Sequence, residues 1–258
     1  ARGIEVIVCD RPNPLGGVVV EGNVVHPGFE SFVGAYPLAV RHALTIGEVA
    51  RFLNATQKWQ AKLTIVELQN WRREQLYPTT GGLWSQPSPN MPTFDTTVVY
   101  PGTCLFEATN VSEGRGTTRP FEIIGAPFVD PKEYAAALNA QKLPGVYFRP
   151  LYFKPTFHKF KDEACGGVFV HVTDVTVFES FYTGLAMVKT AHDLYPNEFD
   201  WRREPYEYVT DKLAIDILSG SAQFRLNVER DESLADYRNA YIGEARDFHK
   251  QAVDFSLY

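Results

Sequence analysis

Two glutamates and an arginine stand close together in the polar run FEATNVSEGRGTTRPFE, which extends from Phe106 to Glu122. Glu107 and Glu113 form a carboxylate pair of the kind that glycoside hydrolysis uses, in which one acid protonates the leaving oxygen and the other group acts at the anomeric carbon. Six residues cover roughly 20 Å when extended and about 9 Å in a helix, whereas catalytic pairs lie roughly 5 to 9.5 Å apart. The spacing therefore permits this chemistry only if the chain curls.

Glycines in the same run favour such a curl. Gly114 and Gly116 allow backbone conformations that other residues avoid, so successive N–H groups could face an anion while Arg115 or Arg119 offers a planar fork to a carboxylate. The other polar side chains that could contact a bound group are Asn110, Ser112 and Thr117. The alternative is a polar loop whose arginines and glutamates pair on the surface. The run matches neither the P-loop nor the dinucleotide-binding fingerprint.

A second group of polar residues follows an apolar run near the start of the chain. The run IEVIVCD, Ile4–Asp10, is rich in β-branched residues and predicts a strand that is buried on both faces, as in parallel sheets. Function in such sheets collects at the carboxyl ends of the strands. The polar residues at this end are Asp10, Arg11 and Asn13.

Arg41 and His42 precede a predicted helix and form a third candidate group. The imidazole of His42 suits a general base or a partner for a sugar hydroxyl, and the alternative is a histidine that caps or packs the loop. Thr45 and Glu48 match the T-x-x-E capping box, so Glu48 is expected to cap this helix and not to act in catalysis.

The order of the predicted elements indicates an α/β fold. The helix after Thr45 is followed by the strand LTIVEL, residues 63–68, and a strand–helix–strand order is typical of a parallel sheet. Residues 71–93 are rich in Pro, Gly and Ser, and so long a loop in a compact domain is usually functional. Beyond Asp130, which marks a helix start, the pattern predicts two strands and further helices, the last over residues 234–254. This second region has the pattern of a smaller α+β domain.

Composition and charge exclude several classes of function. The 258 residues carry a formal net charge of −6 with both signs interspersed, so no basic surface is expected for nucleic acid or for an anionic membrane. No apolar run approaches the ~20 residues of a membrane span. Cys9, Cys104 and Cys165 are too widely spaced for a metal motif, and the histidines have no ligand spacing, so no metal is expected.

Several long stretches carry a family resemblance: DRPNPLGG, FVGAYPLAVRHALTIGEVA, WSQPSPNMPT, VYPGTCLFEATNVSEGRGTTRPFEIIGAPFVD and LPGVYFRP. In this order, and with the closing helical region, they resemble the exo-acting N-acetylmuramidases of peptidoglycan recycling, a family formerly catalogued as a domain of unknown function. The block YPGTCLFEATNVSEGRGTT is long enough to be specific. The resemblance implies a hydrolase that removes N-acetylmuramic acid from the non-reducing end of short peptidoglycan glycans, with no metal or nucleotide cofactor.

The resemblance also implies an active cleft between a larger Rossmann-like domain and a smaller second domain. N-acetylmuramic acid carries a lactyl carboxylate, an acetamide and hydroxyls, which require arginines or N–H groups and also amide and carboxylate partners. Suitable residues are Arg11, Arg41, Arg115 and Gly116 for the carboxylate, and Asn13, Asn90, Asn110 and Glu107 for the other groups. We therefore expect an incomplete Rossmann-like parallel-sheet domain over residues 1–126, followed by a smaller α+β domain over residues 127–258 that closes the cleft.

The chain departs from the family pattern near its start. Members of the family have a longer amino-terminal half with an E-H-G motif and a D-x-Q-D-type motif, and neither motif occurs here. We expect a carboxyl-terminal part whose sheet is completed by a missing or separate amino-terminal segment. Hydrolysis is the first hypothesis, and the alternatives are a non-catalytic muropeptide- or sugar-binding module and one subunit of a larger assembly. The substrate class favours a periplasmic or secreted location.

Overall fold

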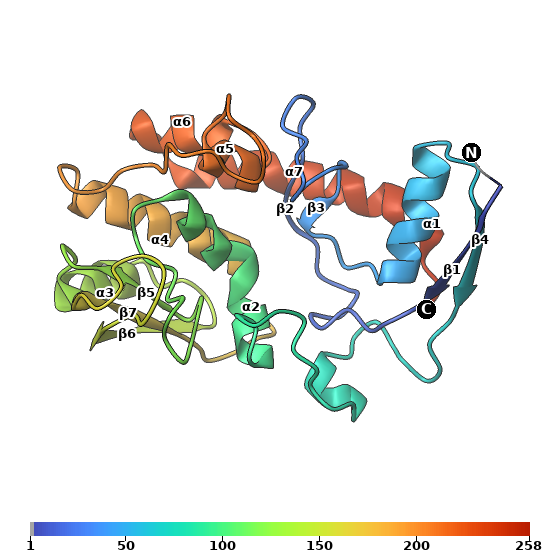
Figure 1. The fold of residues 1–258 in the computed structure, drawn as a ribbon, viewed down its shortest axis with the longest axis horizontal. Helices are drawn as coiled ribbons and strands as arrows, with labels where there is room; N and C mark the ends of the chain where they lie inside the picture. Colours follow the sequence, from blue (N-terminus) through green and yellow to red (C-terminus); the bar gives the residue numbers. More distant parts are fainter. Residues whose placement is uncertain (1–2) are drawn as a thin grey trace.

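The computed structural model describes residues 3–258 and shows two parts side by side (Figure 1). The first part holds two parallel strands, β1 (Glu5–Cys9) and β4 (Lys62–Val66), which pair along their whole length. Helix α1 (Ile46–Thr56) lies between them in the chain and packs against both. The predicted strand–helix–strand unit with parallel pairing is thus confirmed.

Helix α1 begins where the sequence predicts. The Thr45 hydroxyl accepts the Glu48 N–H at 3.2 Å, and Glu48 Oε2 accepts the Thr45 N–H at 2.9 Å. This reciprocal capping box satisfies two N–H groups at the start of the helix that would otherwise lack partners. Glu48 therefore caps the helix, as expected.

The faces of the parallel sheet are more exposed than the sequence predicts. Val6 is 44% exposed, Ile7 62% and Val66 52%. Within residues 3–258 this sheet has two strands, and α1 covers one side of it. The prediction of a strand buried on both faces is therefore wrong for this part of the chain.

The second part is built on an antiparallel sheet with the strand order β5-β7-β6. Its strands are β5 (Ile123–Ala126), β6 (Val146–Phe153) and β7 (Cys165–Val172). Helix α3 (Pro131–Ala140) packs on β6 and β7, and α4 (Ser180–Leu194) packs on α3. The strands and helices predicted beyond Asp130 are confirmed.

Helix α2 (Phe94–Thr103) packs along α4 at a pair of glycines. A Cβ atom on Gly102 would lie 2.0 Å from the carbonyl oxygen of Ser180, and one on Gly184 would lie 2.2 Å from the carbonyl oxygen of Gly102. The two backbones can approach this closely only because both residues lack a side chain. The sequence pattern did not reveal α2, since Pro101 and Gly102 interrupt its helical signal.

The hydrogen bonds of β5 show where the two parts divide. The predicted boundary between residues 126 and 127 falls at the end of β5, but β5 pairs with β7, and α2 packs on α4. Residues 94–126 therefore pack with the second part and not with the parallel sheet. The polar run between α2 and β5 is held within this second part.

The rest of the chain links the two parts. Strands β2 (Glu21–Val24) and β3 (Ala39–Arg41) form a short antiparallel pair, and β2 packs on α7 (Leu234–Ala252). Figure 1 shows α7 running from the second part back toward α1. The chain end returns to the parallel sheet, where the Tyr258 hydroxyl donates to Asp10 Oδ2 at 2.7 Å and accepts the Leu68 N–H.

The remaining elements are short. They are the helices α5 (Ala214–Leu218) and α6 (Gln223–Glu229) and the 3-10 turns η1 (Tyr77–Thr80), η2 (Cys104–Ala108) and η3 (Val253–Phe255). Across residues 3–258, no helix has both the length and the apolar character that a membrane crossing needs.

Candidate functional site

The polar run curls so that one arginine contacts both candidate carboxylates. Arg115 Nη2 lies 2.6 Å from Glu107 Oε1, and Arg115 Nε lies 3.2 Å from Glu113 Oε1. Gly114 and Gly116 have φ angles of 77° and 85°, in the left-handed region that favours glycine. The curl required for the two acids to lie near each other is therefore present, and we call Glu107, Glu113 and Arg115 the acid–arginine cluster.

Two basic residues from a distant loop complete the surroundings of Glu113. Lys159 Nζ lies 2.9 Å from Glu113 Oε2, and His158 Nδ1 lies 3.1 Å from Glu113 Oε1. Lys159 also donates to the carbonyl oxygens of Phe106 and Val111, at 2.7 and 3.0 Å. Burial lowers the pKa of Lys159, and the Glu113 carboxylate opposes that shift. No sequence signal identified these partners, because they lie more than 40 positions further along the chain.

The two glutamates differ in accessibility. The Glu113 side chain has no exposed surface, whereas that of Glu107 is 13% exposed. The hydroxyl of Tyr206 donates to Glu107 Oε2 at 2.8 Å, and burial together with Glu107 raises the pKa of that tyrosine. A ligand can therefore approach Glu107 in this conformation but cannot contact Glu113.

A cavity of about 450 Å³ lies on the side of Tyr206. Its walls include the aromatic rings of Tyr36 and Tyr100, the thiol of Cys104 and the imidazole of His42. Burial raises the pKa of the Cys104 thiol to about 12, with a further contribution from Glu107, so the thiol stays protonated at neutral pH. His42 and Tyr206, the tyrosine that donates to Glu107, therefore line the same cavity.

The other polar residues of the run bond within the protein. Asn110 donates to the Glu198 carbonyl and accepts the Asp200 N–H. The Gly114 N–H donates to Ser112 Oγ at 3.1 Å, and the Thr117 N–H donates to the Gly114 carbonyl at 3.1 Å. The predicted row of N–H groups directed at an anion is therefore partly used to stabilise the loop.

The residues at the carboxyl end of β1 also have internal partners. Asp10 is 6% exposed and accepts hydrogen bonds from the Thr45 and Tyr258 hydroxyls, each at 2.7 Å, and from the Gly47 N–H at 2.8 Å. Asn13 donates to the Leu44 carbonyl at 3.0 Å. In this structure Asp10 and Asn13 fasten the start of α1 and the chain end to the parallel sheet, whereas Arg11 is exposed.

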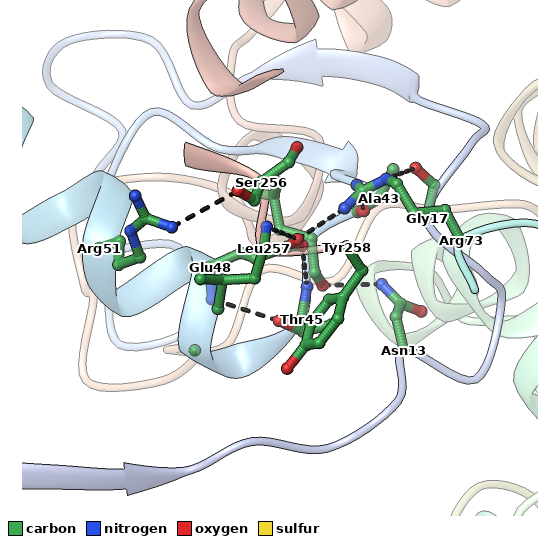
Figure 2. A network of polar contacts seen from close by, with 12 residues as sticks. Asn13, Gly17, Ala43, Thr45, Glu48, Arg51, Arg73, Ser256, Leu257 and Tyr258 are labelled. Carbon is green, nitrogen blue, oxygen red and sulfur yellow. Dashed lines mark hydrogen bonds and ion pairs between the residues drawn. The ribbon is translucent and has the colours of Figure 1, made fainter. Parts of the chain in front are cut away.

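Figure 2 shows the polar network around Glu48, which adjoins these contacts. Arg73 Nη1 lies 2.6 Å from Glu48 Oε1, and the Leu257 N–H donates to the same oxygen at 2.8 Å. The side chain of Glu48 has no exposed surface, so the charge of Arg73 compensates the cost of burying this carboxylate. The network ties the loop over residues 71–93 and the carboxyl terminus to α1.

The remaining predicted site residues lie at separate positions. Arg41 donates to Glu21 Oε1 at 2.7 Å and to the Leu15 carbonyl at 2.9 Å. His42 Nδ1 accepts the Leu44 N–H, and burial lowers the pKa of this imidazole while Glu48 opposes the shift. Asn90 is partly buried in the loop that precedes α2. Within residues 3–258, no cluster of three or more His, Cys, Asp or Glu side chains is arranged to hold a metal.

Comparison with known proteins shows which family the chain matches. The family models described as "Exo-beta-N-acetylmuramidase NamZ, N-terminal" and "Exo-beta-N-acetylmuramidase NamZ, C-terminal" match residues 1–95 and 98–258. A curated relative, the peptidoglycan beta-N-acetylmuramidase NamZ of Bacillus subtilis (strain 168), is 42% identical over 257 residues, which cover 100% of this chain and 60% of that protein. The chain thus spans about three-fifths of the length of this relative.

Two solved structures of DUF1343 family proteins from Bacteroides fragilis NCTC 9343 are similar in fold. One superposes with a TM-score of 0.88 at 32% identity. The superposed region covers 98% of this chain and 66% of that chain. The other has a TM-score of 0.72 at 24% identity and supports the fold alone. With the two family models spanning almost all of its residues, the chain belongs to the exo-beta-N-acetylmuramidase NamZ family.

Proposed function

We propose that the protein is a glycoside hydrolase that releases terminal N-acetylmuramic acid from the non-reducing end of peptidoglycan fragments. The supporting observation is the 42% identity, over the whole chain, to a relative named as a peptidoglycan beta-N-acetylmuramidase. Because the chain spans 60% of that relative, the activity is proposed for the full-length gene product and not for these residues alone.

Within this chain, Glu107 is the carboxylate that we propose to contact the glycan. It has exposed surface, and its two oxygens are held by Arg115 at 2.6 Å and by Tyr206 at 2.8 Å. Arg115 is already paired with two carboxylates, so we assign it to positioning Glu107 and not to binding the lactyl group. Glu113, which has no exposed surface, then acts by holding Arg115 and Lys159 in place.

The test is release of a chromophore from an aryl β-N-acetylmuramide by the full-length gene product. Glu107→Gln should lower turnover by roughly a hundredfold or more, because general acid–base steps contribute about 10²–10⁴ in rate. Glu113→Gln should act mainly on stability, which is measured by thermal unfolding of the same samples. If Glu107→Gln keeps wild-type turnover, this residue does not carry the reaction.

A second candidate is that these residues only bind the sugar and do not supply the carboxylate that reacts. It is favoured by one observation: both glutamates of the acid–arginine cluster are already compensated by cations from this chain. Calorimetry with N-acetylmuramic acid, combined with the turnover assay, separates the two candidates. Binding without hydrolysis supports the sugar-binding role, and hydrolysis that is lost in Glu107→Gln excludes it.

The exposed faces of β1 and β4 support a further proposal about partners. We propose that another segment, in the same polypeptide or in a partner chain, completes this sheet, since exposed strand edges and faces favour pairing. Mass analysis of protein purified from its natural source would identify such a segment and show whether it is covalently continuous with these residues.

A further inference from the structure

The third glutamate of the polar run, Glu122, lies apart from the acid–arginine cluster. It borders a separate cavity of about 470 Å³ between the start of α2 and strand β7. The residues of this cavity that matter here are Phe94, Asp95, Arg119, Glu122, Phe169 and His171. Figure 1 places α2 at the junction of the two parts, directly after the long loop over residues 71–93. We call this cavity the α2–β7 cavity.

The carboxylate of Glu122 is buried but not saturated with donors. Glu122 is 3% exposed, and its Oε1 accepts the Thr96 hydroxyl at 2.7 Å. Among residues 3–258, Oε2 has one contact, 3.3 Å from Arg119 Nη1, and the same nitrogen lies 3.5 Å from Oε1. An ionised carboxylate can accept about four hydrogen bonds, so Glu122 retains acceptor capacity toward the cavity. Burying a carboxylate with so few partners is costly, and such groups concentrate at functional sites.

The backbone next to Glu122 is held in an unfavourable conformation. Phe121 has a φ of 65°, which is uncommon for a bulky residue, and it is 1% exposed. Its ring packs edge-on against Tyr100 with centroids 4.8 Å apart, and the Arg115 guanidinium lies 5.0 Å from its ring centroid. The Val170 N–H donates to the Glu122 carbonyl at 2.8 Å. The surrounding contacts therefore fix the position of Glu122 at the expense of local strain.

Arg119 differs from Arg115 in what it can offer a ligand. The Arg119 side chain is 40% exposed, compared with 24% for Arg115. Within the described chain its guanidinium contacts all run through Nη1, to Glu122 at 3.3 Å and to Asp95 at 3.8 Å. The Nη2 and Nε donors therefore stay available, and together they form the planar fork that binds a carboxylate through two parallel hydrogen bonds.

Apolar walls complete the α2–β7 cavity. Phe94 and Phe169 line it, and the His171 ring stacks on Phe169 with centroids 4.4 Å apart. An aromatic face packs well against the C–H groups of a sugar ring, while a carboxylate accepts from its hydroxyl and amide N–H groups. The cavity thus combines an anion-binding fork, a strong acceptor and an apolar surface.

We propose that Arg119 and Glu122 form a specificity subsite for an N-acetylated amino sugar that carries a carboxylate. Arg119 binds the lactyl carboxylate, and Glu122 accepts hydrogen bonds from the hydroxyl or acetamide N–H groups of the same sugar. This inference rests on the proposed function and adds the residues that distinguish N-acetylmuramic acid from N-acetylglucosamine, which lacks the lactyl group. It also gives Arg119 the role that Arg115 does not fill, because the carboxylate contacts of Arg115 use its Nη2 and Nε donors, whereas those of Arg119 use Nη1.

The experiment measures calorimetric binding of N-acetylmuramic acid and of N-acetylglucosamine to the full-length gene product and to three variants. Arg119→Met should weaken N-acetylmuramic acid roughly tenfold or more and leave N-acetylglucosamine nearly unchanged, since one charge-assisted pair is worth about this much. Glu122→Gln should weaken both sugars. Arg230→Met is the matched control, because Arg230 is an exposed arginine outside the cavity, and it should change neither affinity.

Thermal unfolding and turnover of each variant distinguish a binding role from a structural one. If Glu122 serves only to hold α2 through Thr96, Glu122→Gln lowers the melting temperature without changing either affinity, and the subsite is overturned. The Arg119 side chain is 40% exposed, so Arg119→Met is expected to fold and stays informative even if Glu122→Gln fails to fold. If Arg119→Met hydrolyses the substrate at the wild-type rate and keeps the wild-type preference for N-acetylmuramic acid over N-acetylglucosamine, the subsite alone is overturned. A wild-type protein that neither binds nor hydrolyses N-acetylmuramides overturns the proposed function together with the subsite.

Discussion

Lys159 Nζ lies 2.9 Å from Glu113 Oε2, although the two residues are 46 positions apart in the chain. The contact joins the loop after β6 to the polar run before β5. The buried Glu113 carboxylate is contacted by the cations of Lys159 and Arg115. His158 Nδ1 lies 3.1 Å from Glu113 Oε1. The acid–arginine cluster is therefore a packed ionic network in which Glu107 is the more accessible carboxylate.

The first prediction concerns this ion pair. Lys159→Met should lower the free energy of unfolding by about 3 kcal/mol, because removing one partner of a buried pair leaves the other charge without its closest compensation. Urea unfolding measures the difference. Lys250→Met is the control, since Lys250 pairs with Asp247 on the surface and such pairs are worth less than about 1 kcal/mol. Equal effects of the two substitutions would contradict a stabilising role for Lys159.

Local signals in the sequence were sufficient to predict several elements. The T-x-x-E spacing at Thr45 and Glu48 predicted the start of α1, and Asp130 followed by Pro131 predicted the start of α3. The strand–helix–strand order predicted the parallel pair β1 and β4. These predictions succeed because each depends on residues within a few positions of one another.

Features that depend on tertiary contacts escaped the sequence pattern. Asp10 has the right residue type and place for a ligand contact, yet its Oδ2 accepts the Thr45 and Tyr258 hydroxyls. Its Oδ1 accepts the Gly47 N–H, and Tyr258 is 248 positions away. Tyr206 reaches Glu107 across 99 positions. Residue type could indicate that Glu107 and Arg115 would interact, but not which of the glutamates would remain accessible.

The second prediction concerns the tyrosine that holds Glu107. Tyr206→Phe should lower kcat/KM on an aryl β-N-acetylmuramide roughly tenfold, because it removes a hydrogen bond to a charged group while retaining the ring. The melting temperature should change little, since the aromatic packing remains. Tyr208→Phe is the matched control, because Tyr208 is 90% exposed and its ring packs against Phe32, outside the acid–arginine cluster. Unchanged turnover of Tyr206→Phe would show that this hydrogen bond does not position a reacting group.

The third prediction compares two helical glycines. Gly102→Ala should destabilise the protein by about 1–3 kcal/mol or more, because the new methyl group would meet the Ser180 carbonyl where α2 and α4 touch. Gly243→Ala should instead stabilise it by roughly 0.5–1 kcal/mol, since Gly243 lies within α7 with open space where its Cβ would point, and alanine is the better helix former. Urea unfolding of both variants checks the opposite signs, and a stable Gly102→Ala protein would contradict the close approach of the two helices.

The fourth prediction concerns the pH dependence that Glu122 confers on stability. Burial raises the pKa of Glu122 above its ordinary value of 4.5, although Thr96 and Arg119 oppose the shift and Asp95 adds to it. Between that ordinary value and the raised one, the folded protein binds more protons than the unfolded chain, so this carboxyl makes the free energy of unfolding fall as pH rises.

Glu122→Gln removes the titrating group, so its stability relative to wild type should improve as pH rises from about 4 to about 7. Thr96→Val removes a hydrogen bond that lowers the pKa of Glu122, and it should therefore extend the wild-type fall in stability to higher pH. Urea unfolding at several pH values in this range measures both effects. If the difference in free energy of unfolding between Glu122→Gln and wild type stays constant with pH, the carboxyl does not titrate in this window. The α2–β7 cavity would then hold Glu122 ionised at a smaller cost in free energy than its burial implies.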